Sequence, residues 1–313
     1  GGPQFAHLLL GPLENLAVVE ETVVREKACD SINQLAGIMS DQQIQTFYLP
    51  LLHRLSSGEW FTSRTSAALL FASVYEKIPL SMRADVHSMF VSLCTDETPM
   101  VRRAAARDMS ALVKRMSPEV IINEMLPLYR RLSADDQDSV RLLTVQNLVA
   151  MAEVLSPAET QQLLLSSICG AFQDKSWRVR YMAADNFVQL ATAVGEDVVK
   201  EDLVPAYINL MRDAEAEVRT AAATQLPGLA KLLDQNTIIE RLLPVAKELA
   251  DDPSQHVRGA LAAQVSALAP LLGKDATTEH LLPLFLQLLK DEFPEVRLNI
   301  ISRLEPVSYT HLT

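Results

Sequence analysis

The stretch Asp174–Asp185, DKSWRVRYMAAD, recurs along the chain in altered form. Its second arginine, Arg180, marks the recurrence. Equivalent arginines are Arg25, Arg64, Arg102, Arg141, Arg219, Arg258 and Arg297. Successive arginines are 39 residues apart, except for one gap of 38 residues between Arg64 and Arg102. Eight copies therefore span nearly all 313 residues, which indicates stacked repeats forming one domain, residues 1–307.

Apolar residues recur around each arginine with helical spacing. Valine stands one residue before it in seven copies, and alanine is frequent three and four residues after it, as in Ala183 and Ala184. The position seven residues after it holds Ile32, Phe71, Met109, Leu148, Phe187, Leu226, Val265 and Leu304. The position ten residues after it holds Leu35, Val74, Leu112, Met151, Leu190, Leu229, Leu268 and Val307. These positions share one face of a helix, whose small central residues let a neighbouring helix approach closely.

A second amphipathic segment precedes each of these helices. In five repeats it carries a proline 14 residues before the arginine, namely Pro50, Pro127, Pro205, Pro244 and Pro283. Because proline removes a backbone donor, we expect a kink there. Ser40 with Gln43, and Ser156 with Glu159, have the spacing of capping boxes that start such helices. We therefore predict an all-α solenoid of about eight antiparallel helix pairs, stacked into a right-handed superhelix.

Aspartate stands six residues before the arginine in six successive repeats. Since a guanidinium offers five donors, we predict that each arginine bonds carboxylates of its own repeat and the next. The predicted ladder contains Asp96, Arg102, Asp135, Arg141, Asp174, Arg180, Asp213, Arg219, Asp252, Arg258, Asp291 and Arg297. If exposed, each pair contributes only about 0–1 kcal/mol, so the ladder would mainly fix the stacking angle.

The position three residues before the arginine is chemically mixed. It holds Thr22, Phe61, Pro99, Asp138, Trp177, Ala216, Gln255 and Pro294. A core position would not accept this variety, so we assign it to an outward-facing turn between the two helices. Both tryptophans of the chain, Trp60 and Trp177, lie at this turn, and such aromatic residues are enriched at binding hot spots. The alternative is that each ring folds back onto its neighbouring repeat.

Composition excludes several classes of function. The formal net charge of −11 disfavours nucleic acid and anionic membranes as partners. The three cysteines form no metal or redox motif, which indicates a reduced intracellular protein with buried thiols. We expect it in the cytoplasm, with the nucleus as a further option. We expect no cofactor, and we find no signal peptide or membrane-spanning run. The chain opens inside an apolar segment without methionine, so we interpret it as part of a longer protein.

An enzyme and a transport adaptor are the rival functions. The sequence has no glycine-rich phosphate loop and no nucleophile elbow. Helical-repeat metal hydroxylases need His-Glu pairs, but no histidine precedes glutamate here, neither His7, His53, His87, His256, His280 nor His311. We therefore expect no enzyme activity. An importin-like adaptor that holds basic cargo on an acidic face is compatible with the net charge.

The repeats resemble HEAT repeats, and more specifically those of the scaffold (A) subunit of protein phosphatase 2A. The resemblance covers about Leu8 to Leu304 and rests on strings such as VEETVVREKA, WFTSRTSA, DETPMVRRAAA, DDQDSVRLLTVQNL, DKSWRVRYMAAD and DAEAEVRTAAA. It implies a horseshoe of fifteen repeats, of which these eight are similar to the third to tenth. Regulatory (B-type) subunits would dock on the turns of the earlier repeats, and the catalytic subunit on the last ones.

Carried over to this sequence, the resemblance implies a partner-binding surface. Its residues are Trp60, Phe61, Asp96, Thr98, Pro99, Met100, Arg103, Asp135, Asp138, Ser139, Lys175, Ser176, Trp177, Arg178, Glu215 and Glu217. The repeats similar to the catalytic-subunit site do not occur, so the catalytic subunit is an expected partner only of a chain that carries them. The final residues, 308–313, depart from the family pattern and are interpreted as a tail.

Overall fold

The computed structural model describes residues 2–303, which divide into two compact units. The first unit ends at Val154 and the second begins at Leu155. The expectation of one domain over residues 1–307 stays a prediction. Leu304, Val307 and the tail, residues 308–313, lie outside the described residues.

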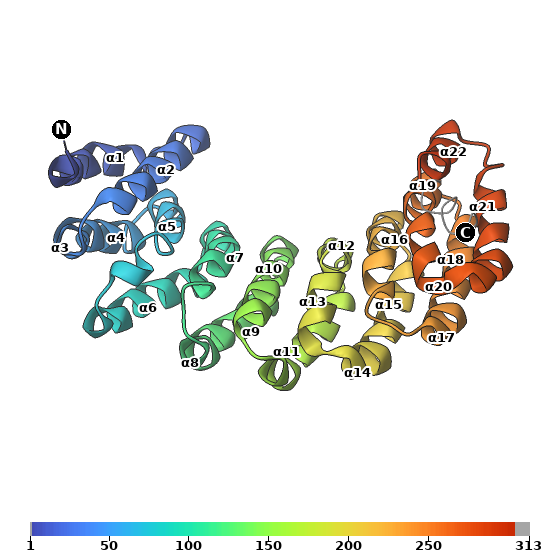
Figure 1. Ribbon diagram of the computed structural model, residues 1–313. Coiled ribbons are helices and arrows are strands. Elements are labelled where there is room, and N and C mark those ends of the chain that lie inside the picture. The colour runs from blue at the N-terminus through green and yellow to red at the C-terminus, as the bar shows by residue number, and fades with distance from the viewer. Residues whose placement is uncertain (1, 304–313) are drawn as a thin grey trace. The chain divides into compact units, whose positions relative to one another are not determined.

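The first unit consists of helices joined by short turns (Figure 1). In chain order they are η1 (Pro3–Leu9), α1 (Leu10–Leu16), α2 (Thr22–Ile38), α3 (Asp41–Gln43), η2 (Ile44–Tyr48), α4 (Leu49–Ser56), α5 (Phe61–Ala68), η3 (Tyr75–Lys77), α6 (Leu80–Cys94), α7 (Pro99–Val113), α8 (Pro118–Val120), η4 (Ile121–Met125), α9 (Leu126–Ser133) and α10 (Asp138–Val154).

The second unit continues the same alternation. Its helices are α11 (Pro157–Phe172), α12 (Trp177–Asp185), α13 (Phe187–Val194), α14 (Glu196–Val198), η5 (Val199–Leu203), α15 (Val204–Met211), α16 (Ala216–Ala230), α17 (Gln235–Thr237), η6 (Ile238–Leu242), α18 (Leu243–Ala250), α19 (Gln255–Gln264), η7 (Val265–Leu268), α20 (Ala269–Ala276), η8 (Thr277–Leu281), α21 (Leu282–Leu288) and α22 (Pro294–Ile301). No strand occurs within residues 2–303 of the chain.

Each unit has two layers of helices. The second helices of successive repeats pack side by side, as α2, α5, α7 and α10 in the first unit and as α12, α16, α19 and α22 in the second. The first helices form the other layer, with α1, α4, α6 and α9 in the first unit and α11, α15, α18 and α21 in the second. The predicted all-α solenoid of antiparallel helix pairs is confirmed.

The predicted apolar positions form the seam between the two layers. Seven residues after the arginine, the described side chains are at most 1% exposed, from Ile32 to Val265. The paired alanines, such as Ala183 and Ala184, are fully buried, which allows close helix approach. Val24 departs from the pattern with 42% exposure, because α2 has a second helix, α5, beside it on one side only.

The kink predicted at the prolines takes the form of a wide helical turn. In all five proline-containing first helices, a π-helical segment of five residues ends two residues before the proline. The wider turn accommodates a residue that has no amide hydrogen to donate. Serine replaces the proline at Ser88 and Ser166, and the corresponding helices α6 and α11 are uninterrupted α-helix. The proline therefore marks where the wide turn forms.

Other local signals act as the sequence indicates. Ser40 and Gln43 form a reciprocal capping box, as do Ser156 and Glu159. Gly195 and Gly273 have φ values of 87° and 72°, which favour glycine. Gly195 lies just before α14, whereas Gly273 lies inside α20 and kinks it.

Candidate functional site

Each turn between the two helices of a repeat is tied to its neighbour by an arginine. Arg180 Nε lies 2.6 Å from Asp213 Oδ2, and Arg180 Nη2 lies 2.9 Å from Asp213 Oδ1. Arg180 Nη1 donates to the backbone carbonyls of Asp174 and Lys175 in its own turn, at 2.8 and 3.4 Å. One guanidinium therefore forms hydrogen bonds both within its own turn and to the turn of the next repeat.

The same arrangement recurs in both units. The bidentate pairs are Arg64–Asp96 and Arg102–Asp135 in the first unit, and Arg180–Asp213, Arg219–Asp252 and Arg258–Asp291 in the second. Arg141 and Arg297 likewise donate to the carbonyls of Asp135 and Asp291 in their own turns. Each aspartate, Asp174 included, also accepts a hydrogen bond from the backbone N–H two residues ahead.

Two details differ from the predicted ladder. An arginine bonds one carboxylate, that of the next repeat, because the aspartate of its own repeat contributes a backbone carbonyl instead. The pairs are also less exposed than assumed. The arginine side chains are 10–18% exposed and the aspartate side chains 5–9%. Breaking such a partly buried pair leaves an uncompensated charge and costs more than breaking a surface pair.

The pairing shifts the carboxyl groups toward their charged form. Burial alone would raise the pKa of Asp135 and of Asp213. Hydrogen bonds from the partner arginine and from a backbone N–H outweigh burial, so both pKa values lie below the usual range. Hydrogen bonds from Arg258 likewise hold the pKa of Asp291 below its usual range. These carboxylates remain charged near neutral pH.

The chemically mixed position, three residues before the arginine, lies at the start of the second helix rather than in the turn before it. Its eight residues do not lie in the turn: each is the first residue of a second helix. A side chain at a helix start projects beyond the packed seam, so none of the eight is buried. The variety of residue types at this position follows from that exposure.

The aromatic residues at this position, Phe61 and Trp177, and the preceding Trp60 are exposed. Trp60 is 73% exposed, Phe61 is 42% exposed and Trp177 is 37% exposed. The guanidinium of Arg178 lies 5.7 Å from the centre of the Trp177 ring. Met100, the second residue of α7, is 50% exposed. Neither tryptophan is fully buried.

The structure separates the remaining predicted partner-binding residues into two groups. Asp96 and Asp135 are held by Arg64 and Arg102, so their carboxylates are occupied. Exposed or half-buried side chains in the first unit are Thr98, Pro99, Arg103, Asp138 and Ser139, and in the second unit Lys175, Ser176, Arg178, Glu215 and Glu217.

One exposed apolar residue was missed by the sequence analysis. Val23, the second residue of α2, is 81% exposed. The sequence does carry a signal for it: Val23 is apolar and stands two residues before the arginine of its repeat, as Met100 does in α7. Since α2, α5 and α7 pack side by side, their first residues lie on neighbouring helix ends. We call Val23, Trp60, Phe61, Pro99 and Met100 the helix-start surface of the first unit.

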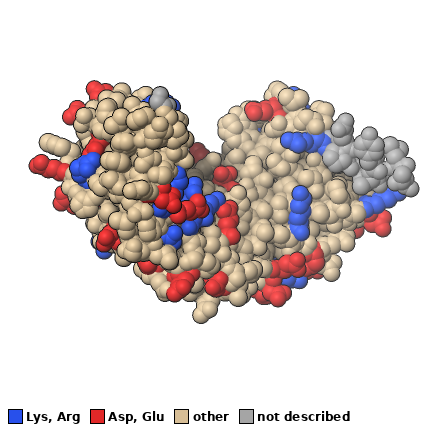
Figure 2. Space-filling view, turned by 60° about the vertical axis from the view of Figure 1, so that its left-hand side comes forward, with Lys and Arg blue, Asp and Glu red and all other residues tan. Residues whose placement is uncertain are grey.

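On the face drawn in Figure 2, charged side chains of both signs occur. Figure 2 shows acidic and basic side chains interspersed on a face that is mostly of other residue types. Within residues 2–303, no group of three or more His, Cys, Asp or Glu side chains could hold a metal ion, and no helix is long and apolar enough to span a membrane. Cys29 and Cys94 are buried as predicted, whereas Cys169 is only half-buried.

Comparison with known proteins places this arrangement in a family context. Residues 196–273 match a family model described as PPP2R1A-like HEAT repeat, and residues 116–232 match one described as PIK3R4-like, middle domain. Over 134 residues the chain is 50% identical to the regulatory (A) subunit of protein phosphatase PP2A of Schizosaccharomyces pombe, which covers 42% of this chain and 23% of that protein.

Over about two fifths of its length this chain is similar to the regulatory (A) subunit of protein phosphatase 2A. A second relative is the beta isoform of the human 65 kDa regulatory (A) subunit of serine/threonine-protein phosphatase 2A, 51% identical over 114 residues, or 36% of this chain and 19% of that protein. The chain thus matches less than a quarter of the length of these relatives. They are named regulatory subunits rather than catalytic ones, in agreement with the expectation of no enzyme activity.

Solved structures with the same fold include karyopherins. A Kap121p mutant has a TM-score of 0.71 at 13% identity, covering 99% of this chain and 37% of that one. Kap95p, in a study of RanGDP switch loops, has a TM-score of 0.70 at 15% identity, covering 98% of this chain and 41% of that one. At such identity the likeness concerns the fold alone.

Proposed function

We propose that this chain is a non-catalytic scaffold of a protein phosphatase 2A-type complex and that its helix starts dock regulatory (B-type) subunits. The observation that carries the proposal is the identity of about one residue in two with proteins named as the regulatory (A) subunit of that phosphatase. Binding of the catalytic subunit is proposed only for a chain that carries further C-terminal repeats.

The helix-start surface supports the docking half of the proposal. Trp60 and Phe61 present large, rigid, apolar groups with little conformational entropy to lose on binding. Val23 and Met100 extend the apolar area on the neighbouring helices. Beneath this surface, the bonds of Arg64 to Asp96 and to the carbonyls of Gly58 and Glu59 hold the turns in place. A partner would therefore meet a preorganised surface.

The importin-like alternative gains little from the structure. Its support is the karyopherin fold, which is shared at only 13–15% identity. An importin-like adaptor would need an acidic face for basic cargo, whereas Figure 2 shows acidic and basic side chains interspersed on the face in view.

Affinity of the purified chain for a purified B-type regulatory subunit tests the proposal. We expect Trp60→Ala to weaken binding by about 30-fold or more, as hot-spot truncations do. The matched control is Leu80→Ala, which removes a residue of the same unit that is 80% exposed but lies at the start of a first helix, α6. Absence of binding by the unaltered chain, or equal binding by Trp60→Ala, would contradict the proposal.

A further inference from the structure

Within the described residues, Arg25 has no partner carboxylate in the next repeat, unlike its equivalents Arg64, Arg102, Arg180, Arg219 and Arg258. Arg25 Nη1 donates to the carbonyls of Val19 and Glu20 at 2.8 and 3.0 Å, as its equivalents do in their own turns. In the next repeat, however, the position of the pairing aspartate is Gly58. Within the described residues, Arg25 Nη2 bonds only Thr22 Oγ1, at 3.3 Å, and Nε bonds no group. The Nε and Nη2 atoms, which bind a carboxylate in the equivalent arginines, contact none in Arg25, although Arg25 is only 8% exposed.

The turn around Gly58 cannot supply the missing carboxylate. A Cβ at Gly58 would lie 2.7 Å from Ser63 Cβ and closer still to Ser63 Oγ. Such close approach excludes a side chain unless the turn moves. The ladder of the chain therefore supplies no carboxylate to the Nε edge of Arg25.

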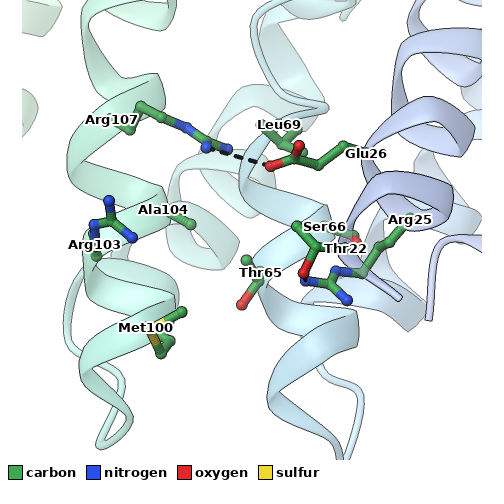
Figure 3. Close-up of a pocket in the computed structure, with 10 residues that line it drawn as sticks. All are labelled: Thr22, Arg25, Glu26, Thr65, Ser66, Leu69, Met100, Arg103, Ala104 and Arg107. Atoms are coloured by element: carbon green, nitrogen blue, oxygen red, sulfur yellow. Dashed lines mark hydrogen bonds and ion pairs between the residues drawn. The ribbon is translucent and has the colours of Figure 1, made fainter. Parts of the chain in front are cut away.

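Arg25 borders a cavity among α2, α5 and α7. The cavity has a volume of about 110 Å³, and the hydroxyl groups of Thr22, Thr65 and Ser66 line it together with Arg25. Figure 3 shows the Arg25 guanidinium directed from α2 toward α5, with Thr65 and Ser66 beside it. The volume equals that of a few water molecules, which suits a single small anionic group.

The cavity carries unbalanced positive charge. Arg103 and Arg107 line it from α7, and Glu26 is its one acidic lining residue. Arg107 is already balanced, with its guanidinium 3.7 Å from Glu26 (Figure 3). It also lies 3.3 Å from Asp108. Arg103 is exposed and, within residues 2–303, has no acidic partner within ion-pair distance. Within residues 2–303, Arg25 and Arg103 are therefore the lining arginines without an acidic partner, and Figure 3 shows their guanidinium groups apart, with Thr65 between them.

We propose that this cavity binds the carboxylate of an aspartate or glutamate presented by a protein docked on the adjoining helix-start surface. The guanidinium edge of Arg25 would grip it as Arg64 grips Asp96, and Arg103 would add a second charge. Thr22 and Met100 line the cavity and belong to the first turns of α2 and α7, so the cavity adjoins that surface. The partner's identity rests on the proposed function, whereas the anion site does not.

The anion site is tested by nuclear magnetic resonance of the arginine side chains in the full chain. The probe is N-acetylglutamate amide, with N-acetylglutamine amide as the uncharged control. We expect a saturable shift of the Arg25 Nε–H signal with the glutamate probe alone. Arg103→Gln should weaken binding about 10-fold, the loss of one charge-assisted bond. Arg212→Gln, which changes an exposed arginine of the second unit outside the partner-binding residues, should leave it unchanged.

Each other outcome counts against the inference. No saturable shift, or equal binding by Arg103→Gln, would remove the site. Inorganic phosphate that binds more tightly than the glutamate probe would overturn the assignment to a carboxylate. If the probe binds but Arg103→Gln keeps the same affinity for the regulatory subunit, the site stands and its assignment to that partner falls. Failure of the proposed function itself is distinguishable, because the unaltered chain would then bind no regulatory subunit.

Discussion

Arg180 Nε and Asp213 Oδ2 lie 2.6 Å apart although 33 residues separate them in the sequence. The spacing joins consecutive turns, because the aspartate stands six residues before the arginine of a repeat that begins 39 residues later. A contact of this kind fixes how one helix pair sits on the next. The surface formed by the helix starts depends on it.

Removing the charge of one ladder aspartate should destabilise the second unit. Asp213→Asn keeps the acceptor for the Glu215 N–H but leaves the Arg180 guanidinium, 18% exposed, without its anion. We expect a loss of about 1–3 kcal/mol in the free energy of unfolding, measured with urea at neutral pH. Glu248→Gln breaks the exposed Arg212–Glu248 pair and should cost at most about 1 kcal/mol. Equal losses would show that burial of the ladder is unimportant.

Stability should fall in acid because of the same pairs. The pKa values of Asp135, Asp213 and Asp291 are lower in the folded chain than the ordinary value. The unfolded chain therefore binds protons first, so these groups stabilise the fold above about pH 4 and lose that effect as pH falls through the folded pKa values. The melting temperature measured from pH 7 to pH 3 should drop below about pH 4. Asp213→Asn should show a shallower drop, and an unchanged slope would count against this explanation.

The wide turns should tolerate loss of proline better than regular helices tolerate its gain. Pro244→Ala restores an amide in a π-helical context and should change stability by less than about 1 kcal/mol. Ser166→Pro places a proline in the uninterrupted helix α11 and should cost about 3 kcal/mol or more. Thermal unfolding of both variants measures the difference. A harmless Ser166→Pro would mean that α11 adopts the wide turn readily.

Val23→Lys should weaken the docking of a regulatory subunit while leaving the fold intact. The side chain is 81% exposed, so the substitution should change the free energy of unfolding by no more than about 0.5 kcal/mol. On the proposed surface it replaces apolar area with a charge, and we expect affinity to fall about 5-fold or more. Titration calorimetry gives the affinity. Unchanged affinity would confine the docking surface to Trp60 and its nearer neighbours.

The repeat, the helix pairs and the buried positions could be predicted because each follows from local patterning. The spacing of Phe187, Leu190 and the alanines gives one face of a helix, and the 39-residue period gives the stack. The proline at position 244 indicated a kink. Its form as a π-helical turn depends on the backbone satisfying its own hydrogen bonds, which a residue pattern does not reveal.

The partners within the ladder could be predicted only in part. The recurring arginine and aspartate indicated a pairing, but not that Arg180 would use the carbonyl of Asp174 and the carboxylate of Asp213. That choice depends on how far one turn lies from the next. The empty place opposite Arg25 had a signal, since Gly58 interrupts the aspartate series. Its consequence, a cavity among three helices, required the packing of α2, α5 and α7.

Hydrogen–deuterium exchange of the chain with and without a bound B-type regulatory subunit tests the central claim most directly. The account predicts slower exchange on binding at residues 58–62 and 97–100, where the helix-start surface lies. Exchange at residues 39–41 and 78–81, which connect one repeat to the next at the opposite helix ends, should not change. Protection confined to those connections, with none at the helix starts, would contradict the account.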